Sequence, residues 1–134
     1  MTDVFVAGSL HWDVVVNAPR LPGLDETLMG HNVTYRFGGK GGNQAVAAAQ
    51  MGASVAMAGR IGHDDAGQRL RAVLEESGVD HGQVRACDEP SGMRAENIEA
   101  HGDNGAGVVT GATPILSGDD IVATPDAKEL QLQN

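Results

Sequence analysis

The stretch Gly38-Gly39-Lys40-Gly41-Gly42-Asn43 joins a predicted strand to a predicted helix and constrains the fold more than any other segment. Before it, residues 29–37 alternate apolar and polar side chains, which predicts a strand with one face in water. After it, the alanine-rich residues 43–51 predict a helix that ends at Gly52. A glycine-rich turn before a helix exposes backbone N–H groups that suit oxygen-rich ligands. On spacing alone, a ligand loop and a plain strand-to-helix turn are both open.

Outward from this stretch, short apolar segments alternate with predicted helices. Residues 4–8 form a continuous apolar run that predicts a strand buried on both faces, and residues 54–58 predict a second. The acids at 64–65 precede a helix predicted over 66–77, where they favour the positive end of the helix. This order predicts an α/β protein with a parallel sheet, from which residues 9–37 depart as an extended excursion.

The second half of the chain adds a predicted hairpin. Residues 91–111 have a strand-like composition, with a turn at 102–105 whose Asp-Asn-Gly sequence is typical of hairpins. Residues 118–120 suit the cap of a short helix, and residues 129–133 predict another strand. The chain then stops without a closing helix. We therefore expect a C-terminally truncated sheet with an unpaired apolar edge.

Length, composition and charge limit the class of protein. The 134 residues suit one domain, and 41% hydrophobic residues are enough for a packed core. Lys and Arg number 9 against 18 Asp and Glu, so the formal net charge is −9 and a nucleic-acid partner is not expected. No apolar run approaches the roughly 20 residues that span a bilayer, and the N-terminus lacks a secretory signal. We expect a cytoplasmic protein with no membrane partner.

Few single residues indicate chemistry by themselves. Asp13 follows the first predicted strand, where open α/β sheets place their ligand crevice, and its carboxylate could accept hydrogen bonds from two sugar hydroxyls; a solvated turn acid is the alternative. His11 and Trp12 fit the same crevice or an exposed loop. His63 beside the acids at 64–65 suggests a metal site, but helix-start acids explain the pair better and no histidine has metal-ligand spacing. We therefore expect no metal site.

Taken together, these motifs resemble the ribokinase, or PfkB, family of carbohydrate kinases. The similarity begins at residues 8–13, continues at 22–27 and is strongest at 38–45, which resembles the N-terminal signature of the family. Gly52 and Gly62 stand where that signature has its later glycines. The resemblance implies a ribokinase-like three-layer αβα fold with a mostly parallel sheet, and a small β-sheet lid that closes over the sugar.

The resemblance makes residues 1–134 the N-terminal part of one ribokinase-like domain. Gly38 and Gly39 would form the hinge of the lid, because glycine tolerates the backbone rotation of such a movement. Lids of this family also pair two subunits, so a homodimer is implied. Glu96 and Asn97 place polar side chains in one lid strand, which leaves the integrity of the lid open. The implied lid strands lie near 13–17, 29–37, 91–101 and 106–111.

The resemblance also implies a sugar site. Asp13, Lys40 and Asn43 would hold sugar hydroxyls, and Gly39 would approach the sugar through its backbone. His11 would line the same site, in place of an asparagine common in the family. The implied reaction is phosphorylation of a pentose such as D-ribose by ATP with Mg²⁺, with a monovalent cation in some members. Adenosine, fructose phosphates and 2-keto-3-deoxygluconate are open alternatives as substrates.

The same resemblance predicts that the chain lacks the catalytic half. The Asp-Thr-X-Gly-Ala-Gly-Asp motif of the family, which supplies the anion hole and the base aspartate, does not occur in the 134 residues. Phosphoryl transfer depends on such preorganised groups, so we expect no catalytic residue, no bound ATP or Mg²⁺ and no activity in this chain alone. A non-catalytic sugar-binding or dimerisation module and a truncated product are the alternatives.

Overall fold

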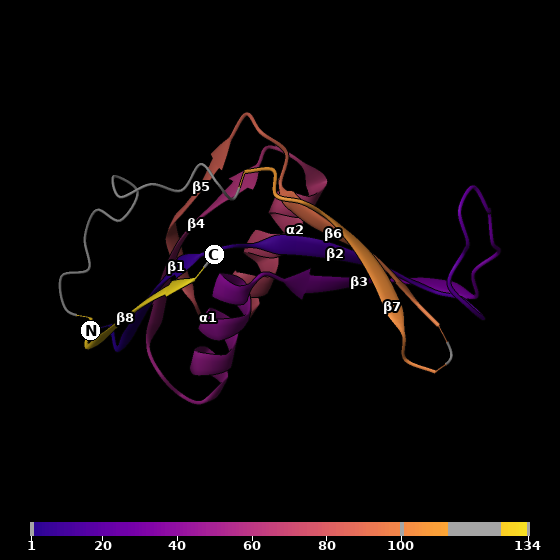
Figure 1. Cartoon of the computed structure of the whole chain (residues 1–134). Coiled ribbons are helices and arrows are strands. Elements are labelled where there is room, and N and C mark those ends of the chain that lie inside the picture. Colours follow the sequence, from indigo (N-terminus) through magenta and orange to yellow (C-terminus); the bar gives the residue numbers. More distant parts are fainter. Residues whose placement is uncertain (1, 100, 113–126, 134) are drawn as a thin grey trace.

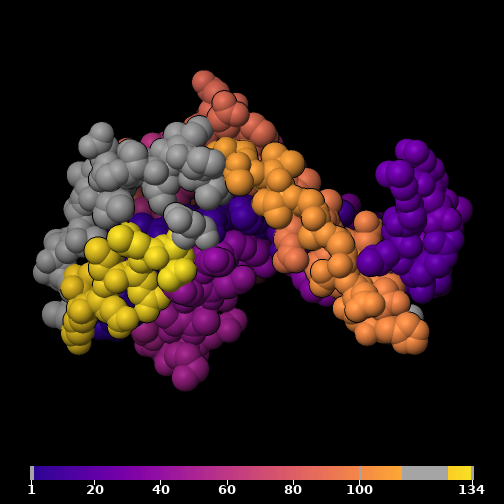
Figure 2. All heavy atoms as spheres, in the orientation of Figure 1, coloured from indigo at the N-terminus to yellow at the C-terminus, as the bar shows by residue number. Residues whose placement is uncertain are grey.

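The computed structural model describes residues 2–99, 101–112 and 127–133, and these residues form two four-stranded sheets and two helices (Figure 1). One sheet lies in the body of the molecule with both helices, and the other extends from the body as an arm (Figure 2). The elements are β1 (Val4–Gly8), β2 (His11–Asn17), β3 (Asn32–Gly38), α1 (Lys40–Gln50), β4 (Val55–Gly62), α2 (Asp65–Glu76), β5 (Asp80–Cys87), β6 (Gly92–Ile98), β7 (Asn104–Val109) and β8 (Glu129–Gln133).

The body sheet has the strand order β5-β4-β1-β8, and all of its pairs are parallel. Side chains alternate along β1, so Val6 and Phe5 point to opposite faces. The sheet face that carries Val6 packs against both helices. The buried cluster on this face includes Ala45, Met57, Leu70 and Leu74. Phe5 belongs to a smaller cluster with Ala7 and Ala58. The described residues therefore contain the parallel sheet and one helical layer of the expected αβα arrangement.

Both helices begin earlier than the sequence predicts, β4 continues to Gly62 where the prediction ended at residue 58, and one further strand was not predicted. Helix α1 begins at Lys40 rather than at residue 43, because the glycine run forms its first turn. Helix α2 begins at Asp65, with Asp64 as its cap. Strand β5 was not predicted, because polar residues and a glycine fill most of its positions and only Val84 is buried. The predicted strand at 129–133 is β8, which pairs with β1, and residues 118–120 lie outside the described residues.

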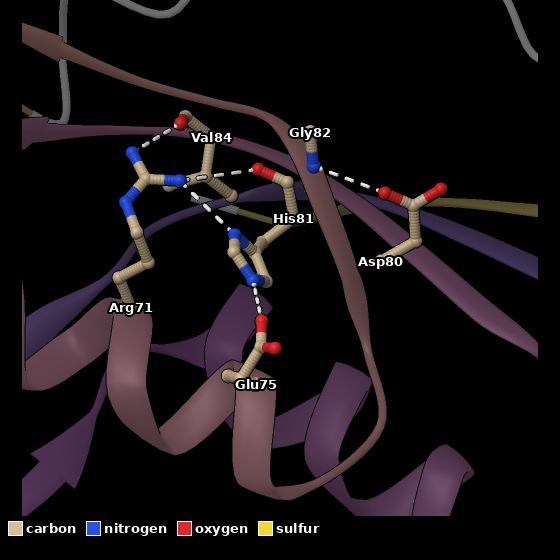
Figure 3. A network of polar contacts seen from close by, with 6 residues as sticks. All are labelled: Arg71, Glu75, Asp80, His81, Gly82 and Val84. Carbon is tan, nitrogen blue, oxygen red and sulfur yellow. Dashed lines mark hydrogen bonds and ion pairs between the residues drawn. The ribbon is translucent and has the colours of Figure 1, made fainter.

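A side-chain network joins α2 to β5, which is an edge strand of the body sheet (Figure 3). Arg71 donates hydrogen bonds to the backbone carbonyls of Val84, at 2.6 Å, and His81, at 3.3 Å. The same guanidinium lies 3.0 Å from Nδ1 of His81, whose Nε2 contacts the carboxylate of Glu75. The pairing of β5 with β4 is irregular just here, between Asp80 and Gln83. Arg71 thus satisfies backbone carbonyls beside an interruption of the ladder.

The arm is the second sheet, with strand order β3-β2-β6-β7. Strand β2 pairs antiparallel with β3 and parallel with β6, and β6 pairs antiparallel with β7. These strands cover the ranges expected for lid strands, with ends that differ by a few residues. Glu96 and Asn97 do not interrupt β6, which pairs with β2 from Gly92 to Ile98. Between β6 and β7, the Glu99 carboxylate accepts hydrogen bonds from the backbone N–H groups of His101 and Asp103. Asn104 and Gly105, predicted as part of the turn, belong to β7.

The prediction of one wet face for residues 29–37 is wrong. Strand β3 is an edge strand, and its residues 32–36 are exposed on both faces. Val33 is 51% exposed and Tyr35 is 61% exposed. The alternating pattern predicts the strand and its two faces correctly, but it does not tell whether another part of the chain covers the apolar one.

Candidate functional site

A pocket of about 440 Å³ lies where the body meets the arm. The five residues for which the sequence predicts sugar contact all line it: His11, Asp13, Gly39, Lys40 and Asn43. They come from two elements, since β2 supplies the first two and the start of α1 supplies the others. The sequence motif and the resemblance thus lead to side chains that the fold brings together. Ser9, Arg94, Ala106 and Val108 complete the lining.

The glycine stretch brings the start of α1 into backbone contact with the β1–β2 connection. Gly39 has φ +93°, and a Cβ atom built on it would lie 2.5 Å from the carbonyl oxygen of Ser9. A Cβ atom on Gly41 would lie 2.8 Å from Cα of Gly8. In this close packing the backbone N–H of Lys40 donates to Oγ of Ser9, at 3.1 Å. Glycine is therefore required at 39 for its backbone conformation and at 39 and 41 for space.

Asp13 and His11 are half-buried titratable groups of the pocket. Burial raises the pKa of Asp13, although the positive charge of Arg94, and that of His11 when its ring is protonated, opposes this shift. Burial lowers the pKa of His11, so its ring is neutral at pH 7. Within the described part of the chain, Oδ1 of Asp13 and Nε2 of His11 are buried and have no hydrogen-bond partner. Buried polar atoms are normally paired, so these two atoms indicate where a polar ligand binds.

Arg94 is a pocket residue that the sequence reasoning missed. The pairing of β2 with β6 places it directly beside Asp13, on the face of the arm that covers the pocket. Its guanidinium nitrogen Nη2 lies 3.6 Å from Oε1 of Glu96, which is itself buried. The sequence indicated that the strand that is now β6 contains polar side chains, but not where they point. Their position over the pocket follows from the register between two strands about 80 residues apart in sequence, which no local pattern reveals.

Trp12 does not line this pocket. Strand alternation turns it to the opposite face of β2 from Asp13. There its ring stacks on Tyr35, with centroids 6.4 Å apart and an interplanar angle of 11°. The guanidinium of Arg69, on α2, lies 6.0 Å from the centre of the Trp12 ring. Trp12 therefore connects the outer face of the arm to the body.

The acids at 64–65 stand at the start of α2, as the sequence predicts: Asp64 caps the helix and Asp65 lies in its first turn. Oδ1 of Asp64 accepts the backbone N–H of Gly67 at 2.8 Å and the hydroxyl of Ser91 at 2.7 Å. Oδ2 accepts the backbone N–H of Ser91 at 2.9 Å. In residues 2–99, 101–112 and 127–133, no group of three His, Cys, Asp or Glu is placed to hold a metal. The helices of the same residues include none that is long and apolar enough to cross a membrane.

A larger cavity of about 550 Å³ lies between α2 and β5, and its lining includes Arg71, Glu75 and His81. These three side chains bond to one another and to the backbone of β5 (Figure 3). Polar atoms of these side chains therefore already have partners within the protein. The smaller pocket at the base of the arm, with buried atoms that lack partners, is the better candidate for a ligand site.

Residues 1–126 of the chain match the model of the pfkB family carbohydrate kinases. The chain belongs to this family. It is 38% identical to the ribokinase of Bacillus subtilis (strain 168) over 112 residues, which are 84% of this chain and 38% of that protein. The predicted resemblance is therefore confirmed.

Solved structures of the family show the same fold. The ribokinase from Cryptococcus neoformans var. grubii serotype A in complex with ADP superposes with a TM-score of 0.81 and 30% identity, over 100% of this chain and 41% of that one. The ribokinase of Arabidopsis thaliana complexed with ribose and ATP superposes with a TM-score of 0.78 and 32% identity, over 90% of this chain and 42% of that one. The ribokinase-like fold class is thereby confirmed, and this chain spans about two fifths of the length of these relatives.

Proposed function

We propose that this chain forms the sugar-binding part of a ribokinase-like kinase that, when complete, phosphorylates a pentose such as D-ribose with ATP. The single observation that carries the proposal is the pair of buried atoms, Oδ1 of Asp13 and Nε2 of His11, that lack a partner within the described chain and line one pocket with Lys40 and Asn43. Family membership supports the reaction class.

The pocket offers the donors and acceptors that a sugar requires. The carboxylate of Asp13 accepts hydrogen bonds from neighbouring hydroxyls, and the ammonium of Lys40 donates to hydroxyl oxygens. The amide of Asn43 does both, and Gly39 lets its own backbone approach the ligand. In the proposed cycle the arm acts as a lid that hinges at Gly38 and Gly39 and excludes water from these bonds.

We further propose that this chain alone does not transfer phosphate. The described residues supply no cluster of carboxylates for Mg²⁺, and the positive side chains of the pocket lie beside the proposed sugar site. In the proposal, this pocket holds the sugar and not the ATP–Mg²⁺ complex. In the proposal, the catalytic base, the anion hole and any monovalent-cation site belong to residues outside this sequence.

The proposal includes a cytoplasmic homodimer formed through the arm. The face of the arm opposite to the pocket carries apolar side chains from three strands, and several of them are exposed: Val33, Tyr35, Met93 and Val109. Exposed apolar patches of this kind mark interaction surfaces. A second copy of the same face would cover them in a symmetric contact.

A turnover assay and a binding assay together test the proposal. The purified chain is mixed with ATP and Mg²⁺, ADP release is followed across a panel of sugars, and the same sugars are titrated calorimetrically. We expect no ADP release above background and saturable binding of at least one sugar. Sugar-dependent ADP release would contradict the absence of a catalytic half. Dimers with no heat from any sugar would instead favour a non-catalytic dimerisation module.

A further inference from the structure

The outer face of the arm contacts the body at Trp12. Strand alternation turns this ring away from the pocket, although its two neighbours in β2 are His11 and Asp13, which line the pocket. The ring packs against the main buried cluster of the body. Because the three residues are consecutive in one strand, a shift of Trp12 on the body also moves the two pocket side chains.

Arg69 of α2 contacts Trp12 from the side of the body. Its guanidinium carbon lies 6.0 Å from the centre of the ring, within the range of a cation–π contact. Asp65, one turn earlier in α2, accepts a hydrogen bond from Nε of Arg69 at 2.8 Å and so limits the positions of the guanidinium. Tyr35 stacks on the same ring from β3. The contact thus joins a charge that the body holds to an aromatic ring that the arm holds.

The space between α2 and the outer face of the arm is not closely packed. A pocket of about 410 Å³ lies here, and its lining includes Trp12, Tyr35 and Met93 from the arm and Asp65 and Arg69 from the body. A closely packed interface would fix the angle of the arm by steric contact alone, whereas this space leaves room for the arm to tilt. Individual contacts across the space, such as that of Arg69 with Trp12, therefore help to set the angle.

The angle of the arm determines the shape of the sugar site in the proposed function. That site combines side chains from β2 of the arm with side chains from the start of α1 in the body. We propose that Arg69 and Trp12 are positioning residues for sugar binding, whose contact on the outer face of the arm holds Asp13 and His11 at the distance from α1 that the sugar requires. This inference rests on the proposed function and adds two residues that do not touch the sugar.

The proposed coupling acts in both directions. If the contact of Arg69 with Trp12 strengthens sugar binding, then bound sugar strengthens that contact by the same factor. Trp12 is the single tryptophan of the chain, so its fluorescence reports this reciprocal effect. Bound sugar should therefore reduce the quenching of Trp12 by acrylamide, and the reduction should saturate at the same sugar concentrations as calorimetric binding.

Variants of Arg69 test the effect on the sugar. D-Ribose, 2-deoxy-D-ribose and D-fructose are titrated calorimetrically into the full chain, and each variant is then compared with the native chain on the sugar that the native chain binds most tightly. Arg69→Met keeps the apolar stem without the charge, and it should lower the affinity about 2- to 5-fold, the range for a cation–π contact at an exposed site. Arg69→Lys should restore most of the affinity, because an ammonium group also binds to the face of the ring.

Two controls separate positioning from charge and from folding. Arg85→Met changes the net charge equally at an exposed position of β5, and it should leave the sugar affinity unchanged. Thermal unfolding of Arg69→Met and Arg85→Met should be the same, which shows that lost affinity is not lost folding. In a Trp12→Leu background, Arg69→Met should have no further effect on the affinity, because the partner ring is already absent.

The possible failures are distinguishable. If the native chain binds a sugar, and Arg69→Met and Arg85→Met bind it with equal affinity, the proposed function stands and the inference is wrong. A further loss from Arg69→Met in the Trp12→Leu background would overturn it as well, since Arg69 would then act through another group. Acrylamide quenching that bound sugar leaves unchanged would contradict the reciprocal effect. If the native chain binds none of the three sugars, both the proposed function and the inference fall.

Discussion

At the scale of single residues, Asp13 is the main sugar-binding side chain of the proposal, and its ionised carboxylate lowers the stability of the fold. Its half-buried carboxylate lies on the pocket face of the arm, and burial raises its pKa despite flanking arginines on both neighbouring strands. A carboxyl whose pKa is higher in the folded than in the unfolded chain destabilises the fold at neutral pH, where it is ionised. Sites of this kind favour binding over stability.

Replacement of Asp13 by asparagine should therefore separate function from stability. Asp13→Asn is expected to abolish sugar binding while the melting temperature at pH 7 stays the same or rises, because the variant removes a buried charge. Calorimetric titration and thermal unfolding measure the two effects. In the unmodified chain, sugar binding should weaken as the pH falls through the raised pKa of Asp13. A lower melting temperature in Asp13→Asn would show that the carboxylate stabilises the fold instead.

Gly39 offers a second residue-scale test, with Gly52 as its matched control. Both have positive φ, +93° and +95°, but a Cβ atom at 39 meets the backbone of Ser9 and Leu10 while one at 52 has nothing within 4 Å. Gly52→Ala should cost about 1–2 kcal/mol for the left-handed backbone alone. Gly39→Ala should destabilise the chain more and prevent sugar binding. Denaturant unfolding of the two variants compares them, and equal losses would contradict the close packing at Ser9.

At the scale of elements, the link between α2 and the arm depends on Asp64. This one carboxylate caps the helix at Gly67 and also receives two hydrogen bonds from Ser91, the residue just before β6. The sequence correctly predicts acids at the start of this helix, because acids before an apolar stripe are a local signal. It does not reveal the bonds to Ser91, which depend on a contact 27 residues away.

Removal of the two acids in turn tests this double role. Asp64→Ala should destabilise the chain by about 2 kcal/mol, the upper range for a lost cap. Asp65→Ala should change stability by no more than about 0.5 kcal/mol, because the ion pair of Asp65 with Arg69 is exposed to solvent. Chemical denaturation of both variants measures the difference. Similar losses of unfolding free energy in the two variants would contradict a stabilising link between Asp64 and Ser91.

The same carboxylate predicts a pH dependence. Burial alone would raise the pKa of Asp64, but the hydrogen bonds from Ser91 and Gly67 keep that pKa below its usual value. A lowered pKa in the folded state stabilises the fold above the unfolded-state value, and this contribution is lost as the pH falls through the folded one. The stability difference between the native chain and Asp64→Ala should therefore shrink in acid. A difference that is constant down to pH 2 would contradict this assignment.

At the scale of the whole molecule, the sequence predicts the body better than the arm. The motif at residues 38–43 indicates the family, and with it the pocket formed by Asp13, Lys40 and Asn43. Arg94 and the exposed faces of β3 follow instead from strand register and from what covers each face, which are properties of distant segments. Strand β5 escaped prediction for the same reason, since its pairing with β4 outweighs its polar composition.

The exposed outer face of the arm leads to a prediction about association. Tyr35→Asp should weaken the proposed homodimer, because a charge would be buried in its apolar contact. Met51→Asp is the control, since Met51 is 88% exposed at the end of α1, away from the arm. Sedimentation velocity over a range of concentrations compares the variants with the native chain. Dimers that persist in Tyr35→Asp would place the contact elsewhere.

The most direct test of the central claim is a sugar titration of the isotopically labelled chain, followed by ¹H–¹⁵N correlation spectra. The claim predicts saturable shifts in the backbone amides of residues 11–13 and 39–43 with at least one pentose, and none of these shifts in Asp13→Asn. The amides around Arg71 and His81, at the larger cavity, should not move. Shifts confined to that cavity, or spectra that every sugar leaves unchanged, would contradict the assignment of the sugar site.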